Sequence, residues 1–198
     1  MYSVGTWEQF ELESDQLEND FYLQDRALRK LLRVTEQALK AQLATEEAAI
    51  ASDTALNSTQ AAEKKAALKV AYETQVADVK ASFEKKKEEA KFAMKLKQED
   101  LRFLEEQARL NETYTFTETF VASLPNATQG LLLAEQQKEK DALARKKVER
   151  KTKLWEAHLA TATNATNATL QAEFQTYLSN EAATIGCNAT CVSECAAS

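Results

Sequence analysis

The fold class is indicated first by one stretch, Trp7–Ala51, which reads WEQFELESDQLENDFYLQDRALRKLLRVTEQALKAQLATEEAAIA. It contains no glycine and no proline, and it is rich in Ala, Glu, Leu, Lys and Gln, which are strong helix formers. The whole chain of 198 residues has only 3 Gly and 1 Pro, so few turns interrupt it. The sequence therefore predicts an all-α protein.

The apolar residues of this stretch recur at alternating steps of four and three, which is the pattern of a coiled-coil seam. The line drifts along the helix, and this indicates that the helix leaves strict heptad geometry or contacts a second partner. The first line is Ser14, Leu17, Phe21, Gln24, Leu28, Leu31, Thr35 and Ala38, and its neighbour is Leu32, Leu39, Leu43 and Ile50.

Further along, polar residues at 52–59 favour a turn, because Ser, Asp, Asn and Thr compete for backbone hydrogen bonds. We predict helices over about 7–51, 60–110 and 131–184, joined by a connector over 111–130. In that connector Thr alternates with aromatic residues from Thr113 to Phe120, which is typical of extended chain. The connector packs onto the bundle or, alternatively, pairs as a strand with another copy.

These elements predict one elongated antiparallel three-helix bundle or coiled coil over residues 1–185, followed by a cysteine-containing tail over 186–198. The alternative is one very long helix over 6–111 with a shorter returning helix. Charge favours the bundle, because the stretch 8–25 has seven acidic and no basic residues while 138–153 has eight basic and three acidic ones. In an up-down-up bundle, residues 138–153 would lie beside residues 14–29. The simpler interpretation is that both stretches are solvated faces.

Six of the eight asparagines stand in the triplet Asn-x-Thr, the acceptor signal for N-glycosylation in the secretory pathway. Chance repetition of Asn-Ala-Thr explains some of them, but two of the triplets have other sequences. We therefore expect a glycoprotein with exposed acceptors. The start of the chain has no basic and apolar signal-peptide pattern, so this expectation requires a signal that has been removed. The acceptors are Asn57, Asn111, Asn126, Asn164, Asn167 and Asn188.

All three cysteines, Cys187, Cys191 and Cys195, stand in the tail at a regular spacing of four residues. An odd number in an oxidising compartment indicates an intermolecular disulfide or a free thiol. We expect disulfides between chains; one local loop with a spare thiol is the alternative.

The second predicted helix carries a second apolar line, Phe92, Leu96, Phe103 and Leu110, about 200° around the helix from its seam. The connector over 111–130 could cover this line. The alternative, which we prefer, is an assembly interface between molecules.

No motif for catalysis, phosphate binding or metal binding occurs, so we expect no enzyme, no cofactor and no metal. The only histidine, His158, fits the edge of a core. A net charge of −6 disfavours nucleic acid as a partner, and no apolar run is long enough for a transmembrane segment.

Together these features predict an extracellular structural glycoprotein, secreted or on the cell surface. It would self-assemble through helical surfaces into a filament or matrix, fastened by C-terminal disulfides. A surface-anchored helical recognition or receptor module is the first alternative, and an intracellular coiled-coil scaffold is the second.

Overall fold

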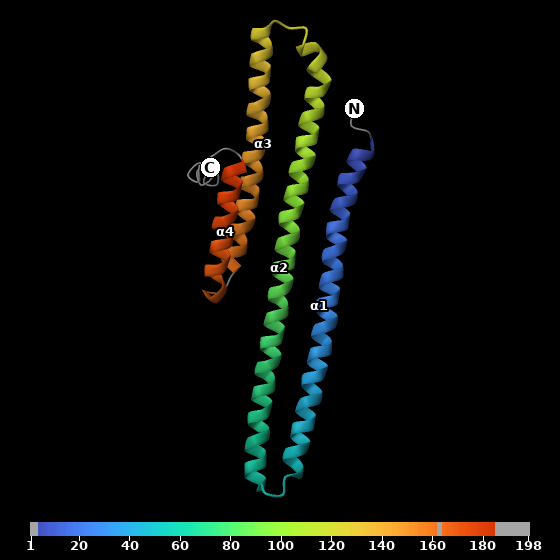
Figure 1. Ribbon diagram of the computed structural model, residues 1–198. Coiled ribbons are helices and arrows are strands. Elements are labelled where there is room, and N and C mark those ends of the chain that lie inside the picture. The colour runs from blue at the N-terminus through green and yellow to red at the C-terminus, as the bar shows by residue number, and fades with distance from the viewer. Residues whose placement is uncertain (1–3, 162–163, 185–198) are drawn as a thin grey trace. The chain divides into compact units, whose positions relative to one another are not determined.

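The structure, a computed structural model, describes residues 4–161 and 164–184. These residues form four helices: α1 (Val4–Ser52), α2 (Ser58–Val121), α3 (Asn126–Thr161) and α4 (Asn164–Thr184) (Figure 1). The chain divides into two compact units. Unit 2 is Asn19–Lys91, and unit 1 comprises the described residues up to Glu18 and from Phe92 onward. Each unit is described separately below.

Within unit 2, α1 and α2 run antiparallel and are joined by a turn (Figure 1). The Oδ1 atom of Asp53 accepts a hydrogen bond from the Ala55 amide at 3.0 Å. Asn57 then caps α2, because its Oδ1 accepts the Gln60 amide at 2.9 Å while the Gln60 side chain accepts the Asn57 amide at 3.2 Å. This capped break excludes the alternative of one continuous helix over 6–111.

The seam of unit 2 follows an 11-residue repeat rather than a heptad. Its half-buried positions include Phe21, Leu32 and Leu43, and also Leu28, Leu39 and Ile50. On α2, the half-buried Ala61, Tyr72 and Phe83 repeat at the same interval. Eleven residues in three turns give 3.67 residues per turn, close to a straight helix, whereas a heptad requires left-handed supercoiling. The predicted heptad line is therefore only partly right beyond Phe21: Leu28 and Thr35 are half-buried, but Gln24, Leu31 and Ala38 are exposed.

Polar residues within this repeat set the register of the two helices. Glu36 and Glu47 of α1 stand eleven residues apart, and they pair with Lys80 at 3.2 Å and Lys69 at 3.8 Å on α2. In antiparallel helices, eleven residues forward on α1 correspond to eleven residues back on α2, from Lys80 to Lys69, so both pairs belong to the same register. A shift by one helical turn would break both pairs at once, so these charges select the register even though exposed pairs stabilise little.

Unit 2 has no hydrophobic core of its own. None of its residues, all of which are described, is fully buried; its apolar seam residues are half-buried. Two helices alone can only shield one stripe on each other, and the remaining circumference of each stays in contact with solvent.

The predicted connector over 111–130 is largely helical, and the prediction of extended chain was wrong. Helix α2 continues to Val121, and α3 already begins at Asn126. The hydroxyls of Thr113 and Thr115 donate to the carbonyls four residues earlier, each at 3.0 Å, so the threonines are accommodated in the helix. A short turn at 122–125 then reverses the chain, and Pro125 stands just before α3, where its missing amide hydrogen is not needed.

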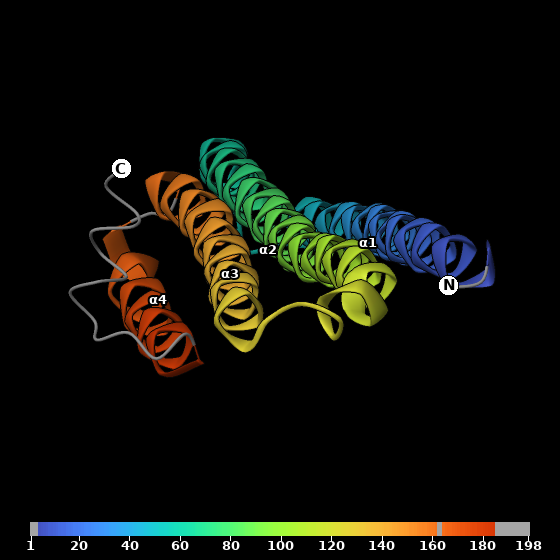
Figure 2. The ribbon, with the colours of Figure 1, turned by 90° about the horizontal axis from the view of Figure 1, so that it is seen from above.

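The predicted third helix over 131–184 is two helices. Helix α3 ends at Thr161, within the Thr- and Asn-rich stretch, and α4 folds back along α3 (Figures 1 and 2). Lys147 lies 3.5 Å from Glu181, and the Trp155 ring stacks on Phe174, which shows the antiparallel arrangement.

Unit 1 therefore contains parts of all four helices, with α2 between α1 and α3, and α3 between α2 and α4 (Figure 2). It has a small core in which Val148 is 0% exposed and Thr152 is 1% exposed. Trp155, Lys151 and Ala108 are also buried. At the other edge of α2, the Arg109 guanidinium lies over the Trp7 ring at 4.8 Å, and Gln98 donates to Glu18. Among the described residues, the buried Val148, Lys151, Thr152 and Trp155 all belong to α3.

The basic stretch of α3 pairs with α2 and α4, and within unit 1 the expected pairing with residues 14–18 of α1 is not observed. Its buried or half-buried cations, Lys147, Arg150 and Lys151, face the carboxylates of α2 and Glu181 of α4. The physical reason is the arrangement of unit 1, since α2 lies between α1 and α3 (Figure 2).

Candidate functional site

The apolar line predicted to be an assembly interface lies partly against α3 of the same chain. The Phe92 ring stacks on His158 at 4.1 Å and meets Trp155 edge-on at 4.8 Å. The Lys147 ammonium lies 5.0 Å from the centre of the Phe103 ring. Leu96 and Leu110 are half-buried. Because α3 supplies these neighbours, Phe92 and Phe103 do not need a second molecule to shield them.

An aromatic cluster surrounds Trp155, which is 7% exposed. Phe174 and Tyr177 of α4 stack against its ring with centroid separations of 5.7 and 6.2 Å. Sequence reasoning placed His158 at the edge of a core, and its stacking on Phe92 agrees with that position. The cluster fastens α4 to α3, and its geometry is that of packing rather than of catalysis.

Several buried polar atoms in the same region lack hydrogen-bond partners. Besides Arg150 Nε, which forms an ion pair with Glu99, four buried side-chain atoms of α3 and α4 have no hydrogen-bond partner among the described residues. Burying such an atom without a partner costs about 1–3 kcal/mol. The α3–α4 contact is therefore held by aromatic stacking and by the Lys147–Glu181 pair rather than by hydrogen bonds of these atoms. They are Thr152 Oγ1, Trp155 Nε1, Asn167 Oδ1 and the Tyr177 hydroxyl oxygen.

The main electrostatic feature of unit 1 is the contact of Arg150 with two carboxylates of α2. Its guanidinium donates two hydrogen bonds to Glu106, at 3.2 and 3.0 Å, and its Nε lies 2.7 Å from Glu99. Burial alone would raise the pKa of Glu106, but the hydrogen bond and charge of Arg150 outweigh it, so the pKa lies below its ordinary value. Burial alone would likewise lower the pKa of Arg150, and Glu106 and Glu99 raise it. Both shifts favour the charged pair.

Tyr177 is kept protonated by its surroundings. Burial raises the pKa of its phenol, and the nearby carboxylates of Glu181 and Asp100 raise it further. The Lys151 ammonium lies 5.5 Å from the centre of the Tyr177 ring, as a cation–π contact. A phenol in this environment is a packing group and not a general base at neutral pH.

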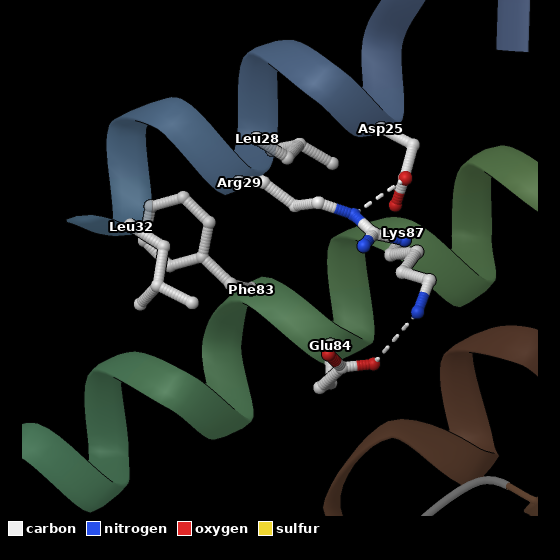
Figure 3. Close-up of a pocket in the computed structure, with 7 residues that line it drawn as sticks. All are labelled: Asp25, Leu28, Arg29, Leu32, Phe83, Glu84 and Lys87. Carbon is white, nitrogen blue, oxygen red and sulfur yellow. Dashed lines mark hydrogen bonds and ion pairs between the residues drawn. The ribbon is translucent and has the colours of Figure 1, made fainter. Parts of the chain in front are cut away.

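Unit 2 contains a shallow groove between α1 and α2, shown in Figure 3. Phe83 faces Leu28 and Leu32 across it, and the Asp25–Arg29 ion pair, at 2.7 Å, stands at its rim. Its volume of about 160 Å³ is below the ~300 Å³ of ordinary ligand pockets. A second groove, lined by Leu39, Leu43, Tyr72 and their neighbours, measures about 120 Å³. Both fit a single inserted side chain better than a small-molecule ligand.

A second apolar face on α1 of unit 2 was only partly anticipated by the sequence. It consists of Leu23, Ala27, Leu31, Val34 and Ala38, which we call the outer face. Leu23 is 51% exposed, and Leu31 and Val34 are each 53% exposed. Val34 stands five residues before Leu39 of the seam, so the two side chains point about 140° apart. The drift of the apolar line along the sequence indicated that α1 has more than one apolar face. The predicted heptad pattern, however, assigned Leu31 and Ala38 to the seam rather than to this outer face.

The predicted glycan acceptors lie in different environments. Asn57 and Asn126 are exposed, and both stand at the beginning of a helix. Asn111 and Asn167 are half-buried within α2 and α4. Asn164 begins α4, and Asn188 lies outside the described residues. None of the four acceptors with described side chains is buried in a seam, which is compatible with modification but does not test it.

The predicted disulfide residues, Cys187, Cys191 and Cys195, lie outside the described residues, so their pairing stays a prediction. Within residues 4–161 and 164–184, no group of His, Cys, Asp and Glu side chains is arranged to hold a metal ion.

No helix in the described part of the chain combines the length and apolarity needed to cross a membrane. Comparisons with protein-family models, curated proteins and solved structures find no match to this chain.

Proposed function

We propose that the protein is a non-catalytic structural glycoprotein that self-assembles through the α1–α2 hairpin of unit 2. The observation that carries this proposal is the absence of any fully buried residue in unit 2, together with the exposed outer face of α1. A hairpin of two helices needs at least one further helix to enclose a hydrophobic core.

The hydrophobic effect supplies the driving force. Helical domains are stable when the apolar stripe of each helix is covered by neighbouring helices. A second hairpin that packs on the outer face would cover Leu23, Leu31 and Val34 and would receive the same cover from its partner. Fully burying one such side chain contributes about 1.5–3 kcal/mol, so a few of them on each copy can offset the entropy of association.

The 11-residue repeat indicates how the assembled helices would pack. We propose a bundle with slight right-handed supercoiling rather than a left-handed coiled coil, because a seam of 3.67 residues per turn drifts around a straight helix in the sense opposite to a heptad seam. Repeated contacts of this kind along the hairpin would suit a filament or matrix.

The six glycan acceptors and the three tail cysteines support an extracellular location. In the proposed assembly the disulfides of Cys187, Cys191 and Cys195 link chains after the helices have associated. Native protein would then run as a multimer on a non-reducing gel and as a single chain after reduction. A single-chain band from oxidised protein under both conditions would remove the disulfide part of the proposal.

The experiment that tests the helical contact compares two variants by light scattering after size-exclusion chromatography. Leu31→Ser with Val34→Ser should lower the oligomer mass while circular dichroism shows unchanged helicity. Tyr22→Ser is the matched control, because Tyr22 is 59% exposed but points about 180° away from Leu31 on the same helix. If both variants keep the wild-type mass, the outer face is not the contact. A recognition module that acts as a single chain would then be favoured.

A further inference from the structure

One end of unit 1 exposes a group of large apolar side chains. Phe120 stands at the end of α2 with 67% exposure, and Leu131, Leu132 and Leu133 follow at the start of α3 with 73%, 37% and 59% exposure. We call these four residues the apolar tip. Such exposure of several large apolar residues at one place marks an interaction surface more often than an ordinary surface.

The backbone of the tip is held in place by local hydrogen bonds. The Gln129 side chain donates to the Leu124 carbonyl at 2.8 Å and to the Ala122 carbonyl at 3.4 Å. The Thr128 amide donates to the Pro125 carbonyl at 2.9 Å. The turn between α2 and α3 is therefore fastened to the first turns of α3, and the leucines are presented from an ordered element.

The sequence around the tip is unusually poor in charge. Between Thr113 and Ala134 the only acidic or basic side chain is that of Glu118. The chain as a whole is 28% charged, so this stretch differs from the faces that are simply solvated. Hydroxyl and amide side chains replace charges here, as in Ser123, Asn126 and Thr128.

The arrangement of the leucines around α3 favours a lipid bilayer over a protein as the partner of the tip. Three consecutive residues span about 200° of a helix, so no single helix or flat protein face can cover all three. A stable dimer interface uses about 20–30 residues on each side, and the tip offers four. A lipid bilayer can surround a helix end on several sides, and it needs only a shallow apolar insertion.

We propose that the apolar tip inserts into the interfacial region of a zwitterionic lipid bilayer. The partner is zwitterionic because the chain has a net charge of −6 and the tip has only Glu118, so neither attracts anionic lipids. The contact is peripheral and leaves the rest of unit 1 outside the bilayer. It does not depend on the proposed self-assembly through unit 2.

One sequence feature controls this contact. Asn126, an exposed glycan acceptor, stands five residues before Leu131. A glycan at Asn126 would hold the leucines away from the lipid, so the membrane-bound form has this residue unmodified. The test therefore uses full-length protein made without glycans.

The first test is flotation with phosphatidylcholine vesicles. Wild-type protein should float with the vesicles, and Leu131→Ser with Leu133→Ser should lower its partition by about tenfold or more, equivalent to ~1.4 kcal/mol. The matched control is Leu12→Ser with Val70→Ser, which removes two aliphatic side chains of 67% and 64% exposure away from the tip and should float like wild type. Raising the salt concentration or adding anionic lipid should not strengthen binding.

A second test does not depend on the stability of the serine variant. Leu133→Trp should show a blue shift of its fluorescence when phosphatidylcholine vesicles are added, and Leu12→Trp should not; both variants keep the native Trp7 and Trp155 as background. The proposal is overturned if wild-type protein does not float, if the tip variant floats equally well, or if the Leu133→Trp emission is unchanged. A tip variant that loses oligomer mass without lipid would show instead that the tip joins copies of the chain.

Discussion

The ammonium of Lys151 lies 2.7 Å from Oδ1 of Asp100, and only 9% of the lysine side chain is exposed. This pair joins α3 to α2 beside the Arg150 pairs, so three charges on one side of α3 meet carboxylates of α2 and α4. Buried pairs stabilise less than apolar packing, but breaking one of them leaves an uncompensated charge. These ion pairs therefore determine the position at which α3 packs against α2 and α4.

Arg150→Ala should lower the free energy of unfolding of unit 1 by about 1–3 kcal/mol, because the half-buried Glu99 and Glu106 lose their contacts with Arg150 and keep only the more exposed Arg102. Chemical denaturation followed by circular dichroism measures this change. Lys153→Ala is the control, since the Lys153–Glu149 pair lies on the exposed side of the same helix and should change the stability far less. Equal effects of the two changes would show that the Arg150 contacts stabilise unit 1 no more than an exposed ion pair does.

Acid should weaken unit 1 through Glu106. Its pKa is lowered in the folded chain from an ordinary value of 4.5, so the folded state binds a proton less readily than the unfolded state. The resulting stability is present above the unfolded pKa and is lost as the pH falls through the folded pKa. A series of melting temperatures below about pH 5 should therefore fall more steeply for the wild type than for Glu106→Gln. Parallel curves for the two proteins would refute this assignment.

Gly130→Ala should stabilise the protein. Gly130 stands within α3, and an added Cβ would meet no atom within 4 Å. Replacing a helical glycine by alanine gains roughly 0.5–1 kcal/mol, because alanine loses less conformational entropy on folding. The melting temperature should rise, and Ala134→Gly one turn later should lower it by a similar amount. A loss of stability with Gly130→Ala would mean that this turn of α3 is not regular helix.

Glycan occupancy should follow exposure. Asn57 and Asn126 are exposed at helix ends, whereas Asn111 and Asn167 are half-buried within helices. We expect Asn57→Gln and Asn126→Gln to remove most of the mass shift that a glycosidase produces on native protein. A native protein whose gel mobility does not respond to the glycosidase is not N-glycosylated, and the extracellular proposal then fails.

Much of the helical content could be predicted from the sequence, because Ala, Glu, Leu, Lys and Gln dominate and Gly and Pro are rare. The break at Asp53–Asn57 could also be predicted, since the Asp and Asn side chains accept the hydrogen bonds of a turn and a helix cap there. These features depend on neighbours in sequence, which is the range at which propensity is informative.

The remaining features depend on tertiary contacts. The alternation of Thr and aromatic residues after Asn111 indicated extended chain, but threonine hydroxyls bond back to the helix and Tyr114 donates to Glu139 of α3. The reversal between α3 and α4 was not predicted, because no local pattern within 131–184 shows that Phe174 and Tyr177 reach Trp155. The heptad assignment failed because short apolar lines fit both seven- and eleven-residue repeats.

Self-association of the reduced, unglycosylated full-length chain tests the central claim most directly. Sedimentation velocity over a hundredfold range of concentration should show a concentration-dependent species of at least two chains, because in the proposed assembly a second copy covers the outer face of unit 2. Its melting temperature should also rise with concentration. A single 22.1 kDa species at every concentration, with a constant melting temperature, would contradict the proposed function.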